Sequence, residues 1–242
     1  MQDEIIKHTK KTIGIMKSSE LGPWGKVKAV VGEILIIVFA VSFSIWLHNF
    51  SEHRHEQAQV REFLSDLHAD LLKDRENMGK IRSQLDVSVE GSSYLFSLST
   101  EEYDKGKSGP DSAAFSRQLT SKIQLPLIIR KNIDGNYEGF KTSGKIALIE
   151  NKPLKKSILA YYQQSLASLD EADRYYNDNL TRMGESLVAL SGKSGREIVF
   201  NPQFRAHLMG VLVNGKNVQS AYDETMRESD DLIRSIDAEL KH

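Results

Sequence analysis

Glu33 is the residue whose position could do chemistry, because it is the one acid in the apolar stretch that runs from Ala29 to Leu47 within residues 27–50. A charge within hydrocarbon is costly, so such an acid is a functional hypothesis by default. Three interpretations stay open. The carboxylate reaches the headgroups or pairs with Lys26 or Lys28, it makes a polar contact that specifies an oligomer or a membrane partner, or it relays protons. Gly32 beside it would let a second helix approach closely.

A group of histidines follows this stretch and has part of the spacing of a metal site. His48 and Glu52 are four residues apart, which places two ligands on one face of a helix. His53 and His55, however, point in different directions on the same helix. We therefore interpret this group as a solvated collar at the membrane surface and predict no metal site.

The remaining catalytic patterns fail on spacing or composition. Gly106-Lys107-Ser108 matches the end of a phosphate-binding loop, but the glycine that such a loop needs five residues earlier is Glu101. The chain has no cysteine, which excludes disulfides, thiolate catalysis and cysteine metal sites. We find no catalytic, cofactor-binding or metal-ligating residue, so the sequence predicts a protein that is not an enzyme.

Residues 27–50 are long and apolar enough to form a transmembrane helix. No charge occurs from Ile34 to Leu47, and about 20 apolar residues cross a hydrocarbon core of about 30 Å. Trp24 and Trp46 lie near the two ends, where indole rings favour the interface. A secretory signal peptide and a buried core helix are the competing interpretations. The late start of the stretch and its aromatic end favour the membrane anchor.

The distribution of basic residues predicts the orientation of this anchor. Residues 1–26 form a lysine-rich tail, whereas the first twenty residues after residue 50 contain only Arg54 and Arg61 among the fully charged bases, besides histidines such as His53 and His55. Basic flanks stay cytoplasmic. We therefore expect a cytoplasmic tail, a single span of a bacterial inner membrane, and a periplasmic domain at residues 51–242. The formal net charge of -1 gives no global attraction to nucleic acid.

The chain after the span has the periodicity of helices. No glycine or proline occurs from Ser51 to Met78, so the span should continue as one long helix. Its apolar residues recur at spacings of three and four, and Asp74 interrupts the seam. This seam suits either an intrachain bundle, which we favour, or a self-associating coiled coil. The seam consists of Val60, Leu64, Leu67, Leu71, Met78, Ile81 and Leu85.

The second half predicts two further long helices and several short ones. Pro153 suits a helical first turn, and the helix should end near residues 191–195. Asn201-Pro202 should begin a short helix that stops before a turn at Asn214-Gly215, and Lys105 to Pro110 should form a loop. We expect Tyr161, Tyr162, Tyr175 and Tyr176 to pack in the core. The chain is therefore predicted to be all-α, with an antiparallel helical bundle outside the membrane.

Two blocks of sequence carry a family likeness. The first is Gly32-Glu33 with Leu47-His48-Asn49-Phe50 and the run Phe63 to Leu71. The second is Tyr137 to Lys152, with the pattern Tyr-x-x-x-Lys-x-Ser-Gly-Lys, followed by a tyrosine pair. Over residues 26–165 the chain resembles an uncharacterised bacterial family of single-span membrane proteins, although Phe50 departs from its tryptophan-containing exit motif. The resemblance implies a membrane protein and no activity.

These features favour a structural or interaction protein. We expect a membrane-anchored subunit of a larger membrane complex, whose periplasmic domain binds a second copy or another envelope protein. The alternatives are a ligand-sensing bundle and a stator-like, ion-coupled component that uses Glu33. The expected partners are the lipid bilayer and a membrane protein, with no cofactor.

Overall fold

A computed structural model describes residues 23–123 and 126–241, and all regular structure in these residues is helical. The chain divides into two compact units, Met1–Gln59 and Val60–His242. Helix α2 (Pro23–Ser97) contributes to both units. The fold class predicted from the sequence, an all-α chain with one long apolar N-terminal helix, is confirmed.

In the first unit, the described residues belong to α2. Among the described helices, α2 alone is long and apolar enough to cross a membrane, and almost none of its most apolar window is buried. Large apolar side chains such as Ile34, Leu35 and Phe39 are exposed. Exposure of so many apolar side chains to water would be unfavourable, which is the pattern expected of a helix whose natural surroundings are apolar.

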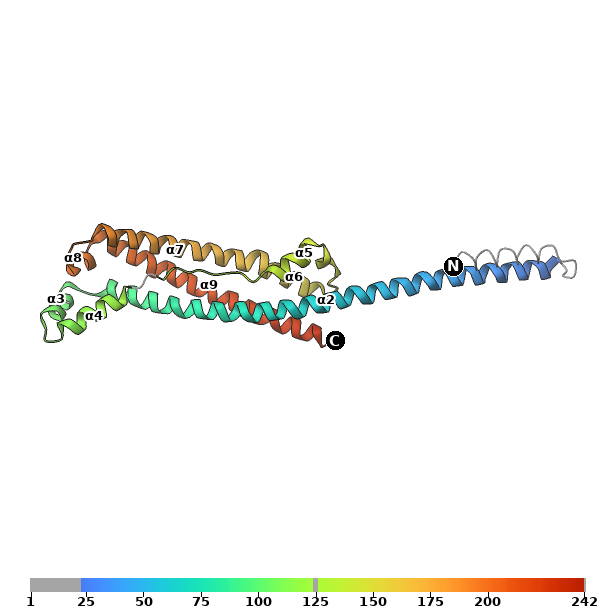
Figure 1. Ribbon diagram of the computed structural model, residues 1–242, viewed down its shortest axis with the longest axis horizontal. Helices are drawn as coiled ribbons and strands as arrows, with labels where there is room; N and C mark the ends of the chain where they lie inside the picture. The colour runs from blue at the N-terminus through green and yellow to red at the C-terminus, as the bar shows by residue number, and fades with distance from the viewer. Residues whose placement is uncertain (1–22, 124–125, 242) are drawn as a thin grey trace. The chain divides into compact units, whose positions relative to one another are not determined.

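The second unit is a bundle built on the later part of α2 and on two more long helices (Figure 1). Helices α7 and α9 pack against each other. The elements after α2 are α3 (Thr100–Ser108), α4 (Ser112–Lys122), α5 (Gly135–Thr142), η1 (Lys145–Leu148), α6 (Lys152–Ala160), η2 (Tyr161–Ser165), α7 (Leu166–Ala189), α8 (Gly195–Val199) and α9 (Pro202–Leu240).

Local sequence explains where several helices begin. The side-chain oxygens of Asn151 and Asn201 each accept a hydrogen bond from the backbone N–H three residues later, at 3.0 Å, and a proline follows in the first turn. Ser99 and Ser194 form reciprocal capping boxes with the glutamate three residues later. Gly144, with a φ of 76°, separates α5 from η1, as a glycine tolerates this backbone geometry.

Two apolar clusters fill the bundle. The first combines the seam residues of α2 from Val60 to Leu71 with side chains of α5, α6 and the end of α9. The second begins at Met78 on α2 and continues with α7 and the first part of α9. Asp74 lies between them in sequence and is buried. The predicted seam is therefore buried within the chain, as an intrachain bundle requires.

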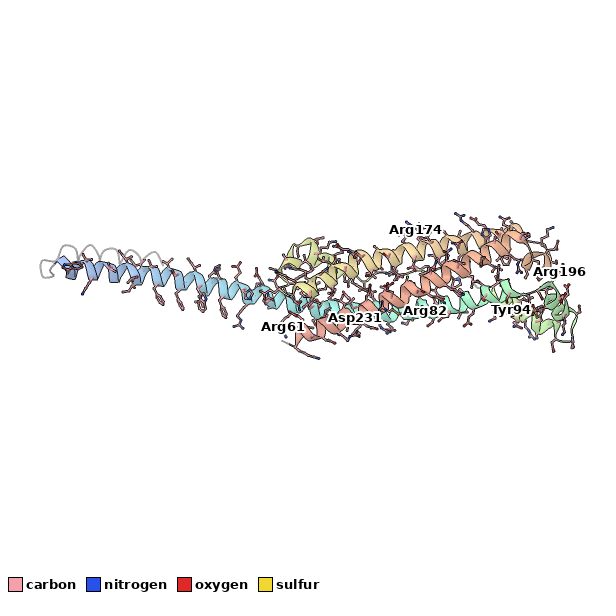
Figure 2. The ribbon with its side chains drawn as sticks, turned by 180° about the vertical axis from the view of Figure 1, so that it is seen from behind. Arg61, Arg82, Tyr94, Arg174, Arg196 and Asp231 are labelled. Atoms are coloured by element: carbon pink, nitrogen blue, oxygen red, sulfur yellow. The ribbon has the colours of Figure 1, made fainter. Side chains whose placement is uncertain are left out.

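Basic side chains on α2 and acids on α9 form a ladder of polar contacts. His68, Arg75 and Arg82 are seven residues apart, and they pair with Asp237, Asp230 and Asp223, which are also seven apart in the reverse direction. Antiparallel helices with a seven-residue repeat give this arrangement. Arg61 adds a contact to the backbone carbonyl of Leu240. Figure 2 labels Arg61 and Arg82 on this face.

Two predicted breaks in the helices are wrong. Asn214-Gly215 is no turn, because α9 continues from Pro202 to Leu240. Gly215 instead allows close packing, since a Cβ there would lie 2.5 Å from Cγ2 of Val89 and 3.4 Å from Cε2 of Tyr176. The loop predicted from Lys105 to Pro110 begins late, because α3, which starts at the capping box of Ser99, extends to Ser108.

Candidate functional site

The predicted intramembrane residues all lie on α2. Glu33 is 5 % exposed and has an interaction partner, and it follows Gly32, where a Cβ would meet nothing within 4 Å. Trp24 and Trp46 are exposed. Trp24 and Trp46 are 22 positions apart, which at 1.5 Å rise per residue corresponds to roughly 33 Å of helix. This length fits interface anchors at the two ends of a membrane span.

An aromatic ridge, which sequence reasoning missed, follows one face of the same helix. It consists of Phe39, Phe43, Trp46 and Phe50, with successive ring centroids 5.9, 5.8 and 5.7 Å apart. The signal was available in the sequence, because spacings of three and four residues place side chains on one helical face. The ridge gives this face a continuous apolar surface.

The histidine group after the apolar stretch of α2 is exposed to solvent. His48 and Glu52 approach to 3.9 Å with both side chains largely exposed. In residues 23–123 and 126–241, no group of three or more histidine or acidic side chains is arranged to hold a metal ion.

The bundle contains a second candidate region, a buried polar layer where side chains of the two apolar clusters and several polar groups meet. We define the polar layer as Asp74, Arg130, Tyr161, Tyr162, Asp173, Tyr222 and Ser229. These residues come from α2, the extended segment before α5, η2, α7 and α9. The sequence signal was the acid at position 74 within the apolar seam, but the pattern alone could not identify its neighbours.

Asp74 is the least compensated charge of the polar layer. It is 5 % exposed, and its Oδ2 has no hydrogen-bond partner within the described residues. Burial raises the pKa of Asp74 to about 6, against the opposing effects of a hydrogen bond from the Ile133 backbone and of Arg130. Asp70 and Asp134 nearby raise this pKa further, because a like charge disfavours ionisation.

Arg130 carries the positive charge of the polar layer. Its Nε lies 3.2 Å from Oδ2 of Asp173, and its guanidinium also pairs with Asp170. The hydroxyl of Tyr222 donates to the same Oδ2 of Asp173 at 3.1 Å. Asn177 holds the adjoining segment by accepting from the backbone N–H of Ile128 and donating to its carbonyl. Arg130 and Asn177 together attach this extended segment to α7.

A π-helical turn, η2, brings two tyrosines into the polar layer. Tyr161 and Tyr162 are buried, and the ring of Tyr162 stacks on Tyr137 with centroids 4.1 Å apart. The hydroxyl of Tyr161 faces the hydroxyl of Ser229 without a well-formed hydrogen bond, and burial raises the pKa of Tyr161 to about 12. Single π-helical turns occur frequently at functional sites.

A groove of about 240 Å³ opens between η2 and α9, beside the polar layer. Tyr161 and Ser165 line one wall, and Glu228 and Ser235 line the other. The groove also includes Asp231, which pairs with Arg234 and is labelled on α9 in Figure 2. The lining is acidic and rich in hydroxyl groups, and it includes no basic side chain. Chemically, this arrangement can accept hydrogen bonds from a cation.

The predicted packing of the tyrosines holds for three of the four. Tyr161, Tyr162 and Tyr176 are buried in the core, whereas Tyr175 is 55 % exposed.

The chain matches no known family model, no curated protein and no solved structure. The family resemblance over residues 26–165 therefore stays a prediction.

Proposed function

We propose that the protein is a membrane-anchored, non-enzymatic interaction module of the bacterial envelope. The observation that carries this proposal is the exposure of the apolar part of α2, from Ile34 to Phe50, with its aromatic ridge. The stretch anchors the chain in the inner membrane, with the lysine-rich tail in the cytoplasm and the bundle in the periplasm. The bundle then contacts a second copy or another membrane protein.

The way in which the bundle uses its charges supports a structural role. His68, Arg75 and Arg82 connect α2 to α9, and Arg130 connects the extended segment to α7. These polar contacts therefore hold helices and segments together. A compact bundle with fixed side chains offers its outer surface to a partner without rearranging its core.

The mass of the full-length protein in detergent tests this proposal. We expect a defined oligomer, or a complex with a second membrane protein when the chain is purified from its native membrane under mild conditions. A monomer that co-purifies with no membrane protein would contradict an interaction role. A variant in which residues 27–50 are deleted, so that the tail is joined directly to the bundle, is the matched control. It should appear in the soluble fraction and no longer in the membrane fraction.

Glu33 carries the second candidate function, a stator-like, ion-coupled component. A buried acid within the apolar stretch favours this candidate. Glu33→Gln keeps the size and polarity of the side chain but cannot release a proton. An ion-coupled role predicts loss of function with the assembly intact, whereas a structural role predicts a change in assembly or no change.

A further inference from the structure

Residues 126–134, which we call the docked segment, precede α5 and contain no helix. Up to Ile133, the docked segment makes no backbone-to-backbone hydrogen bond within the described part of the chain, so side chains of other elements hold it. On α7, the side-chain amide of Asn177 bonds to the backbone N–H and carbonyl of Ile128, at 2.8 and 2.9 Å. On α2, Asp74 accepts a hydrogen bond from the backbone N–H of Ile133. A segment held by so few contacts opens at a lower cost than the helices around it.

The two attachments of the docked segment differ in charge. On the α7 side, Nε of Arg130 lies 3.2 Å from Oδ2 of Asp173, so opposite charges face each other. On the α2 side, Asp134 of the segment and Asp70 of α2 both act on Asp74 as like charges. Arg130 also attracts Asp74, but burial of the carboxyl outweighs this attraction. The α2 side is therefore the attachment that depends on whether Asp74 is ionised.

The surroundings of Asp74 suit a neutral carboxyl better than a carboxylate. The residue is 5 % exposed, and its Oδ2 has no hydrogen-bond partner within the described residues, so an ionised side chain is poorly solvated there. The titratable and charged groups around Asp74 are Asp70 on α2, Arg130 and Asp134 on the docked segment, and Tyr161 and Tyr162 on η2. From α7 and α9, the groups that act on Arg130 or Tyr161 are Asp170, Asp173, Tyr222 and Glu228. The carboxylate can regain water only if one of these elements moves, and the docked segment is the one that contains no helix.

We propose that the docked segment is a proton-controlled latch, which stays on α2 while Asp74 is protonated and detaches from α2 when Asp74 ionises. Detachment admits water to the carboxylate and moves Asp134 away from it, while Arg130 and Asn177 keep the segment on α7. Because burial raises the pKa of Asp74 to about 6, the docked arrangement is stabilised at lower pH and loses this stabilisation as the pH rises through about 6. The latch lies within the bundle, so it does not depend on the proposed interaction role.

Hydrogen exchange of the full-length protein in detergent tests the latch, with single amides resolved by electron-transfer fragmentation. After correction for intrinsic exchange rates, we expect the protection factor of the Ile133 amide to be about 10-fold higher at pH 5 than at pH 7.5, on the two sides of the titration of Asp74. The Ile128 amide, on the α7 side, should have the same protection factor at both pH values. At pH 7.5, the Ile133 amide should also exchange faster than the amide of Leu180, which is buried in α7, as local opening requires.

Several results of this experiment count against the latch. Equal protection of the Ile133 amide at the two pH values overturns the proposal. An equal fall in protection at Ile128 also overturns it, because the whole segment would then leave the bundle. An Ile133 amide that exchanges as slowly as that of Leu180 at pH 7.5 would show that the segment opens only when the bundle unfolds, which rules out a latch.

Variants assign the titration to Asp74. Asp74→Asn keeps the size of the side chain and a hydrogen-bond acceptor but cannot ionise, so the Ile133 amide should be equally protected at pH 5 and pH 7.5. Asp66→Asn is the matched control, because it removes an exposed acid from the same helix and should keep the difference of about 10-fold. Should Asp74→Asn fail to fold, Asp134→Asn removes a like charge that acts on Asp74 and should reduce the difference. A full difference in Asp74→Asn, or in Asp134→Asn where that variant decides, contradicts the assignment.

Discussion

Arg75 of α2 and Asp230 of α9 form a two-pronged ion pair, with Nε 2.9 Å from Oδ1 and a terminal guanidinium nitrogen 3.2 Å from Oδ2. The pair lies in the middle of the ladder, between His68–Asp237 and Arg82–Asp223. A fork of parallel hydrogen bonds has a defined direction, so it selects one alignment of the two helices. We infer that the ladder specifies how α2 and α9 pair more than it stabilises them.

A double-mutant cycle measures the energy of this pair. Arg75→Ala, Asp230→Ala and the double variant should give a coupling free energy of about 0.5 kcal/mol, because both side chains are partly exposed. Urea unfolding in detergent provides the measurement, and 0.5 M salt should reduce the coupling. A coupling above about 2 kcal/mol that persists in salt would contradict a mainly directional role.

Asp74 should make the stability of the bundle depend on pH. Because its pKa is raised from 3.8 to about 6 on folding, the folded protein holds the proton more tightly than the unfolded chain. The resulting stabilisation is complete below pH 3.8 and is lost as the pH rises through about 6. Asp74→Asn should therefore raise the free energy of unfolding at pH 7 by about 2 kcal/mol.

The control for Asp74→Asn is Asp66→Asn, an exposed acid on the same helix. It should change neither the stability at pH 7 nor its dependence on pH. Unfolding measured between pH 4 and pH 8 separates the two variants. An Asp74→Asn variant that is less stable than the unchanged protein at pH 7 would show that the carboxylate is better compensated than its surroundings indicate.

Arg130 should be the most sensitive charge of the bundle. Arg130→Met leaves Asp173 buried without its cation, which costs about 3–5 kcal/mol. Arg174→Met is the matched control, because Arg174 is exposed and its ion pair, with Glu171 one turn away, is also exposed. Its cost should stay below about 1 kcal/mol. Equal losses of unfolding free energy in the two variants would show that Arg130 does not stabilise the bundle through its pairing with Asp173.

Gly215 should tolerate no side chain. Gly215→Ala places a Cβ against Val89 and should cost about 1–3 kcal/mol by overpacking. Gly79→Ala is the control within α2, since its Cβ meets nothing within 4 Å, and it should stabilise the helix by up to about 1 kcal/mol. The combination of Gly215→Ala with Val89→Ala should recover part of the loss. No recovery would indicate strain from another neighbour.

Local signals in the sequence were sufficient for much of this fold. Pro153 and Pro202 each come one or two residues after a capping asparagine, in the first turn of the helix that each was predicted to begin. The apolar seam of α2 predicted a buried face that is present from Val60 to Leu85. These features depend on neighbours a few residues away, so a single sequence contains them.

Features that depend on distant neighbours could not be predicted. The pair Asn214-Gly215 is typical of a turn. The reason for a glycine at this position inside a helix is the close approach of Val89 from another helix. The acid at position 74 was visible as an interruption of the seam, but Arg130 and Tyr161 come close to it through the packing of separate elements. The π-helical turn at Tyr161 likewise has no local signal that we recognise.

The central claim is that the chain has a single membrane span and that its bundle lies outside the cytoplasm. Cysteine labelling tests this claim most directly, because the chain has no cysteine of its own. Single cysteines are introduced at Lys145, which is exposed in η1, and at Ser18 in the tail. A membrane-impermeant maleimide is then applied to spheroplasts. We predict that Lys145→Cys reacts in intact spheroplasts and that Ser18→Cys reacts only after lysis. The reverse pattern, or release of the protein from membranes by alkali, would contradict the account.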